Sequence, residues 1–390
     1  MSLRQRIAQE IRGRGPLPFS RYMELCLYDP IEGYYSRQSW QFGKAGDFYT
    51  SSDVHAVFGR LLARQFDEMW RALDCPPEIE VLELGPGRGL FARDVLDWSA
   101  KRFPDCFAAL RYTLQESSPA LRTKLAGILQ HHIANGGAMI SAGEPDSSAE
   151  TQLAASRSAP KIHRDCTSET PVIVFVNEFF DALPVEILSS RGKLHLALED
   201  DRLRETWLPA AAPELEFLDR YSVHPEAGER VEVPLAAQGW MRQIADSISR
   251  GFLLIFDYGY TRAEQLAGRH RGTLMAYRQH SASSNAYEAP GEQDLTAHVN
   301  FTALAAAAEH GGMHVQKLLT QSQFLMGIGE QNQFADAFED CRLPQERAKV
   351  ALQLKHLATP AGMGETFHVL VASRGVAPEK VRGLSGLRFA

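Results

Sequence analysis

The feature that most constrains the fold of this chain is a glycine-rich turn between an apolar run and an apolar-periodic stretch. Residues 79–84 (IEVLEL) predict a buried strand, residues 85–89 (GPGRG) a turn, and residues 90–98 a helix. Glycine lets the backbone pass close to a ligand without a Cβ, and a helix N-terminus offers unpaired N–H groups. This strand, turn and helix therefore predict a nucleoside-cofactor site in an α/β protein.

Further strands follow the same plan. A short strand is predicted at 112–115, ending at Glu116, and apolar runs at 172–176 and 252–256 are typical of parallel strands buried on both faces. A closing strand is predicted at 367–373. The alternation of strands with helices predicts a doubly wound α/β sheet, in which ligands bind outside the carboxyl ends of the strands.

The segments around these strands predict an organisation with insertions. Helical spacing predicts a helix over 56–73 and another over 240–248. Residues 136–170 are rich in Gly, Ala, Ser and Pro and predict a long loop, and residues 187–235 predict a small antiparallel insertion.

We therefore expect residues 1–75 to form an N-terminal helical cap with a lid segment. Residues 76–390 are expected to form the core, with insertions at about 136–170 and 187–235. The first fifteen residues contain four arginines, as in a transit peptide, but lack serine enrichment and include Glu10. A short amphipathic helix ending near Gly13 is the favoured interpretation.

Composition excludes several classes of function. The formal charge of −7 leaves no large cationic field for nucleic acid, and the longest apolar runs are of strand length, so no membrane insertion is expected. The five cysteines form no C-x-x-C pair, which argues against a zinc ribbon and fits a reducing compartment. The histidines show no ligand spacing, and we expect no metal.

The glycine turn favours one cofactor over another. A dinucleotide site needs a small residue at position 90, where this chain has Leu90. A G-x-G-x-G turn with an acidic residue at the next strand end suits S-adenosylmethionine, whose ribose would meet Glu116. The predicted cofactor residues are Glu83, Gly85, Gly87, Gly89 and Glu116, with Asp47 and Thr50 from a lid. A nucleotide or flavin cofactor, and a merely structural turn, stay open on this motif alone.

A series of ordered blocks resembles the MidA family. The blocks lie at 22–30 (YMELCLYDP), 33–35 (GYY), 46–51 (GDFYTS), 83–89 (ELGPGRG), 177–185 (NEFFDALPV), 257–260 (DYGY), 272–277 (GTLMAY) and 291–302 (GEQDLTAHVNFT). The resemblance runs from about residue 17 to residue 373. It implies a class I methyltransferase (Rossmann-like) fold with a seven-stranded, mostly parallel sheet, an N-terminal helical cap and an inserted β region, and it implies S-adenosylmethionine as cofactor. The mitochondrial member of that family methylates an arginine of a respiratory complex I subunit.

The predicted catalytic residues are Glu178, Asn177 and Asp181, which follow the buried strand at 172–176. A guanidinium presents five N–H donors in a plane and keeps its charge, so a carboxylate holds it best. We expect Glu178 to clamp it and Asp181 to assist. The alternative is that these polar residues cap the next helix. Asp257 is expected either to line the acceptor pocket or to cap a turn.

The segment 46–51 has a composition suited to a lid over the cofactor, and its alternative is an ordinary turn that caps the following helix.

The sequence thus predicts an S-adenosylmethionine-dependent methyltransferase, and the resemblance to the MidA family implies a protein arginine on a respiratory complex I subunit as its acceptor. Its alternatives are a non-catalytic assembly factor that binds the cofactor and a nucleotide-dependent oxidoreductase. The expected partner is a protein substrate, and a homodimer is left open. The expected location is the cytoplasm of a bacterium, or the mitochondrial matrix if the source is eukaryotic.

Overall fold

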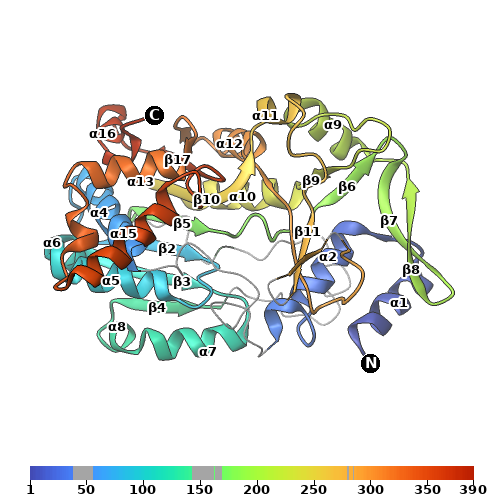
Figure 1. The fold of residues 1–390 in the computed structure, drawn as a ribbon, viewed down its shortest axis with the longest axis horizontal. Coiled ribbons are helices and arrows are strands. Elements are labelled where there is room, and N and C mark those ends of the chain that lie inside the picture. The colour runs from blue at the N-terminus through green and yellow to red at the C-terminus, as the bar shows by residue number, and fades with distance from the viewer. Residues whose placement is uncertain (38–55, 143–161, 163–168, 279–280, 284) are drawn as a thin grey trace.

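The predicted buried strands assemble into one large mixed sheet (Figure 1). The computed structural model describes residues 1–37, 56–142, 162, 169–278, 281–283 and 285–390. Five strands run parallel in the order β10-β5-β2-β3-β4, and β17 pairs antiparallel with β10. Their bounds are β2 (Ile79–Leu84), β3 (Leu110–Gln115), β4 (Ala138–Ser141), β5 (Val172–Asn177), β10 (Gly251–Tyr260) and β17 (Phe367–Arg374).

Three two-residue strands extend the sheet beside β10 and β17. They are β14 (Val299–Asn300), β15 (His314–Val315) and β16 (Leu319–Thr320). The described residues therefore form a nine-stranded mixed sheet, and the expected seven-stranded, mostly parallel sheet is not reproduced strand for strand.

Helices cover both faces of this sheet. Residues that alternate along a strand face opposite sides, and in the central strands both sets are apolar. Ile173 and Phe175 of β5 pack toward one core cluster, and Val172, Val174 and Val176 pack toward the other. The first cluster includes α4 (Ala56–Ala72), α5 (Leu90–Arg102) and α13 (Gln321–Glu330); the second includes α10 (Leu235–Ser247) and α12 (Phe301–His310).

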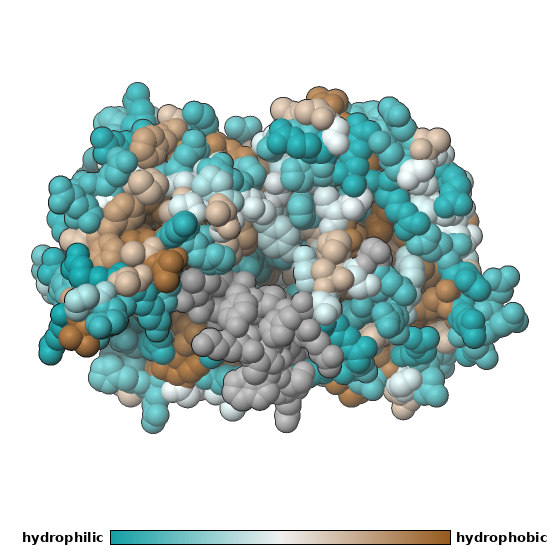
Figure 2. Space-filling view, viewed as in Figure 1, coloured by the Kyte–Doolittle hydropathy of each residue, from teal (hydrophilic) through white to brown (hydrophobic). Residues whose placement is uncertain are grey.

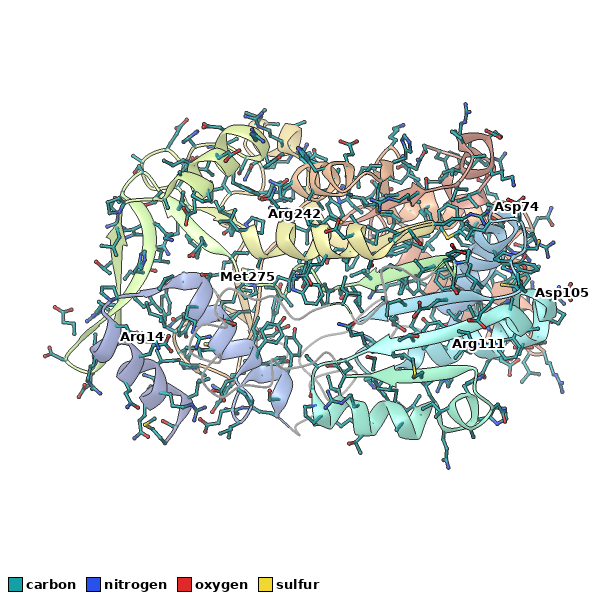
Figure 3. All side chains as sticks on the ribbon, turned by 180° about the vertical axis from the view of Figure 1, so that it is seen from behind. Arg14, Asp74, Asp105, Arg111, Arg242 and Met275 are labelled. Atoms are coloured by element: carbon teal, nitrogen blue, oxygen red, sulfur yellow. The ribbon has the colours of Figure 1, made fainter. Side chains whose placement is uncertain are left out.

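A second lobe is built from segments that are far apart in the sequence. The helices α1 (Leu3–Arg14) and α2 (Phe19–Tyr28) pack against an antiparallel sheet and a three-stranded sheet. The strands are β1 (Leu17–Pro18), β6 (Glu186–Ser189), β7 (Gly192–Glu199), β8 (Arg202–Leu208), β9 (Val231–Val233), β11 (Met275–Arg278), β12 (Ser281–Ser283) and β13 (Asp294–Thr296). Arg14 lies near one end of the molecule and Asp105 at the other, with Met275 of β11 between them (Figure 3).

The two lobes divide the N-terminal region. The apolar side of α1, formed by Leu3, Ile7 and Ile11, packs into the second lobe, whereas α4 packs on α5 in the core. The predicted N-terminal cap of residues 1–75 placed α1 and α4 in one unit, whereas these two helices belong to different lobes. The antiparallel pairing of β6, β7, β8 and β9 is the small insertion predicted for 187–235.

The prediction of a loop over 136–170 is wrong at its start. Residues 138–141 form β4, which pairs parallel with β3 at the edge of the sheet. An edge strand buries little, and Met139 is exposed, so its sequence lacks the apolar run of a central strand. Residues 143–161 and 163–168 lie outside the described residues.

The remaining helices lie on the surface of the two lobes. They are α6 (Pro104–Ala109), α7 (Pro119–Ile128), α8 (Gln130–Ala134), α9 (Ala212–Tyr221), α11 (Arg262–Leu266), α14 (Ala335–Phe338), α15 (Pro344–Ala358) and α16 (Pro378–Arg382), with 3-10 turns at Tyr34–Ser36 and Ser385–Leu387. None of the described helices is long and apolar enough to cross a lipid bilayer. On the face seen in Figure 2, apolar groups are dispersed over both lobes among hydrophilic ones.

Candidate functional site

A cleft of about 440 Å³ lies at the carboxyl ends of β2, β5 and β10, where an open α/β sheet binds its ligands. Both lobes contribute to its walls. The core lobe supplies Glu83, Gly85, Gly87, Glu116, Asn177, Glu178, Asp181 and Tyr258; the second lobe supplies Tyr28, Tyr35, Tyr277, Asp294 and Thr296.

The glycine turn forms one end of the cleft. Gly85 and Gly87 have φ of +64° and +52°, a backbone conformation that costs an L-residue about 1–2 kcal/mol, and both line the cleft. A Cβ at Gly89 would lie 2.5 Å from Cδ2 of Leu125, and Gly89 is not among the residues that line the cleft. Its role at the cofactor stays a prediction.

Two buried carboxyl groups flank this turn. The Glu83 carboxylate accepts a hydrogen bond from the Tyr112 hydroxyl at 2.9 Å, and burial raises the pKa of Glu83 to about 8. Glu116 is 7% exposed and accepts the backbone N–H of Ser118 at 2.8 Å. Burial raises the pKa of Glu116 to about 7 although this N–H lowers it. Both groups gain by meeting the hydroxyl or ammonium donors of a ligand.

The two lid residues predicted for the cofactor, Asp47 and Thr50, lie outside the described residues.

The turn after β5 carries the three predicted catalytic residues, and Asp257 holds it in place. Oδ2 of Asp257 accepts backbone N–H groups from Phe179 at 3.2 Å and Phe180 at 3.0 Å, and from Asp181 at 3.4 Å. Glu178 has a φ of +49°, which is rare outside glycine. Asp257 thus caps this turn, which is the second of its two predicted roles. Its neighbour Tyr258 lines the cleft.

The pKa of Asp257 is raised by burial and by the neighbouring carboxyl groups of Asp181 and Glu178. Several acidic groups are therefore concentrated below this end of the cleft.

Two oxygen atoms in this turn lack a donor. Oδ2 of Asp181 accepts the Tyr258 hydroxyl at 2.5 Å, but Oδ1 of Asp181 and Oδ1 of Asn177 are buried without a hydrogen-bond partner among the described residues. Asn177 instead donates through Nδ2 to Oε1 of Glu178 at 3.2 Å. A buried acceptor without a donor costs about 1–3 kcal/mol, so an N–H group that reached either atom would stabilise it.

Burial also raises the pKa of Asp181 to about 6, against the lowering effect of the Tyr258 hydroxyl. The next element after β5 is β6, so the predicted alternative, in which Asn177 and Asp181 cap a helix, is wrong.

No role was predicted for the aromatic and acidic residues that the second lobe places in the cleft. Tyr28 and Tyr35 stack with ring centroids 5.6 Å apart, and Asp294 is 2% exposed. All three residues occur in the blocks that resemble the MidA family, and this is the sequence signal by which they could have been predicted as site residues. His298 also lines the cleft, with its Nδ1 3.1 Å from Nδ1 of His270, and burial lowers the pKa of His298 to about 4.

Comparison with known proteins identifies the family. Residues 61–319, more than half of the chain, match the family described as "Putative S-adenosyl-L-methionine-dependent methyltransferase". The chain is 29% identical over 396 residues to the protein arginine methyltransferase NDUFAF7 homolog, mitochondrial, of Drosophila melanogaster, covering 96% of this chain and 85% of that one. It is 27% identical to mitochondrial NDUFAF7 of Mus musculus, covering 92% and 81%.

A solved structure supports the same assignment. A Burkholderia thailandensis protein bound to S-adenosylhomocysteine is similar with a TM-score of 0.77 and 26% identity, covering 96% of this chain and 92% of that one. The residues of the cleft fit this cofactor. Two glycines without a Cβ allow a ligand to approach the backbone at one end, and the buried carboxyl groups beside them can accept hydrogen bonds from it. The chain belongs to the MidA family of S-adenosylmethionine-dependent methyltransferases, and S-adenosylmethionine is its cofactor.

Proposed function

We propose that this chain transfers the methyl group of S-adenosylmethionine to an arginine side chain of a protein. The observation that carries the proposal is the pair of buried oxygens, Oδ1 of Asn177 and Oδ1 of Asp181, that lack donors among the described residues and lie beside Glu178. A guanidinium has five N–H donors and no acceptor, so it complements such a set. A lysine ammonium has three donors, all on one nitrogen, and so satisfies fewer separate acceptors at once.

The names of the relatives support the same acceptor class, since those proteins are named protein arginine methyltransferases. The family resemblance makes a subunit of respiratory complex I the first acceptor to test. These relatives are also named as mitochondrial. The compartment of this chain follows from its source: we propose the bacterial cytoplasm, or the mitochondrial matrix in a eukaryote.

On the cofactor side, we propose that Gly85 and Gly87 contact the methionine part and that Glu116 binds the ribose hydroxyls. Glu83 lies fully buried behind the same turn, where its carboxylate would offset positive charge on the cofactor. Asp47 and Thr50 remain the proposed lid residues. Gly89 stays a predicted cofactor residue of the same turn.

On the acceptor side, Glu178 clamps the guanidinium and orients one nitrogen. When bound, S-adenosylmethionine supplies an electrophilic methyl group on a positively charged sulfur. The nitrogen that gains the methyl group must lose a proton, and the Asp181 carboxylate, with its pKa near 6, is placed to accept it. Holding the two reactants in line contributes up to about 7–11 kcal/mol to lowering the barrier.

The decisive experiment is incubation of the purified chain with isotope-labelled S-adenosylmethionine and a lysate of its own source. Mass spectrometry of the labelled protein should find methylarginine. Label on another residue type would refute the arginine acceptor, and cofactor binding without any labelled protein would favour a non-catalytic assembly factor.

A substitution tests the clamp itself. Glu178→Gln should leave cofactor affinity within about twofold and reduce transfer by about 10- to 100-fold, because it removes a charge-assisted bond to the acceptor. Glu309→Gln, at an exposed position of α12, is the matched control and should behave as the wild type. Unchanged turnover in Glu178→Gln would remove Glu178 from the mechanism.

A further inference from the structure

The second lobe contributes its own carboxylate to the cleft. Asp294 begins β13, and in the antiparallel ladder it lies opposite Tyr277 of β11. Residues opposite each other in such a ladder project from the same face, and so do residues two apart along a strand. Asp294, Thr296 and Tyr277 all line the cleft, so this face of the small sheet forms its wall.

Tyrosine side chains surround this carboxylate. Oδ1 of Asp294 accepts the Tyr35 hydroxyl at 3.0 Å, and Tyr35 stacks on Tyr28. The Tyr28 hydroxyl in turn donates to the carbonyl of Ala182 at 3.0 Å, which fixes the aromatic pair to the turn after β5. Asp294 is almost completely buried beside the Tyr35 hydroxyl, and a buried carboxylate gains when it pairs with a cation.

The wall is tied directly to the proposed acceptor site. The backbone N–H of Ala297 donates to the carbonyl of Asp181 at 2.9 Å, and the Thr296 hydroxyl is hydrogen-bonded to Tyr258. Tyr258 donates to the Asp181 carboxylate. Asp294 stands two residues before Thr296, about 7 Å along the same face of β13. Asp181 and Asp294 therefore act on one region of the cleft from opposite lobes.

We propose that Asp294, oriented by Tyr35, binds the positive charge of the methyl acceptor and so selects a cationic side chain. The inference rests on the proposed function, because it assigns a specificity residue to that same site. Asp294 acts on acceptor binding, whereas cofactor binding belongs to the glycine turn of the core lobe. The residue could instead serve only to hold Tyr35, and the two roles predict different behaviour in two conservative variants.

Asp294→Asn keeps an oxygen for the Tyr35 hydroxyl and removes the charge, and Tyr35→Phe removes the hydroxyl and keeps the charge. The assay is titration calorimetry of the full chain saturated with S-adenosylhomocysteine. The probes are a five-residue peptide with one arginine between glycines and the same peptide with citrulline, which has nearly the same shape without the charge. A third peptide carries lysine.

We expect the wild type to prefer the arginine peptide to the citrulline peptide by about tenfold or more, the size of one charge-assisted hydrogen bond. Asp294→Asn should lose that preference while its affinity for S-adenosylhomocysteine stays unchanged. Tyr35→Phe should keep most of the preference for the arginine peptide. Asp246→Asn, at an exposed position of α10, is the control and should match the wild type.

Three results would overturn the inference: a preserved preference in Asp294→Asn, an equal loss in Tyr35→Phe, or a wild type that does not distinguish arginine from citrulline. A wild type that prefers the lysine peptide, with that preference lost in Asp294→Asn, would support Asp294 as the cation-binding residue and refute the arginine acceptor. The failure of the specificity residue and the failure of the proposed function are thereby separated.

Discussion

Replacing Glu83 with glutamine should stabilise the ligand-free protein at alkaline pH. Glu83 is fully buried, and burial raises its pKa from 4.5 to about 8. Between these two values the folded chain keeps a proton that the unfolded chain releases, so the free energy of unfolding falls as pH rises. Each pH unit in this window costs about 1.4 kcal/mol, which sets an upper limit of about 5 kcal/mol above pH 8.

Glutamine removes this pH dependence and keeps the local contact. Its side chain has the same shape, is neutral at every pH, and offers an amide oxygen to the Tyr112 hydroxyl that Glu83 accepts at 2.9 Å. At pH 5, only half a unit above the unfolded pKa of 4.5, the two proteins should differ by less than about 1 kcal/mol. At pH 8.5 Glu83→Gln should be more stable by about 2–5 kcal/mol. The other carboxyl groups of the cleft are present in both proteins and cancel in the difference.

The assay is urea denaturation of both proteins at pH 5, 7 and 8.5, with calorimetry of S-adenosylmethionine binding at the same values. In the proposed site ionised Glu83 offsets the positive charge of the cofactor. The wild type should therefore bind more tightly as pH rises toward 8, and Glu83→Gln should bind at least about tenfold more weakly at pH 8.5. Parallel stability curves for the two proteins from pH 5 to 8.5 would refute the reasoning.

Two further substitutions test the glycine turn and the turn after β5. Gly87→Val places a branched side chain at a φ of +52° on the wall of the cleft and should reduce cofactor affinity measured by calorimetry by more than about 100-fold; an affinity within twofold of the wild type would exclude this turn as the cofactor site. Asp257→Ala leaves the backbone N–H groups of Phe179 and Phe180 without their acceptor and should lower the free energy of unfolding by about 2–4 kcal/mol and abolish transfer. Asp257→Asn keeps an oxygen for these N–H groups and should lose less stability and less transfer activity. Identical losses in the two variants would contradict the role of Asp257 as the acceptor that holds this turn.

The core strands could be predicted from the sequence because each carries its signal locally. The runs at 172–176 and 252–256 are apolar at every position, as expected for strands with helices on both faces, and they form the centres of β5 and β10. The edge strand β4 escaped prediction because only Ala138 of its four residues is buried. Local pattern thus locates a central strand better than an edge strand.

The second lobe could not be predicted because its contacts join segments far apart in the chain. The spacing of Leu3, Ile7 and Ile11 indicates an apolar helix face but not its partner, which is the β6–β9 sheet and the small sheet around β11. The closeness of Leu125 of α7 to Gly89 could not be predicted for the same reason. A glycine motif predicts a tight turn, whereas the side of that turn that meets a ligand is set by tertiary packing.

In the proposed assignment, different parts of the cleft hold the cofactor and the acceptor. Gly85 and Gly87 are held between β2 and α5, within the core lobe alone. The turn that carries Glu178 is held from both sides: Asp257 binds its backbone from the core, and the second lobe reaches it through Tyr28 and the backbone of Ala297. A change in the packing between the lobes therefore shifts the acceptor site directly and leaves the glycine turn in place. Substitutions at the contacts between the lobes should accordingly alter acceptor affinity while cofactor affinity stays constant.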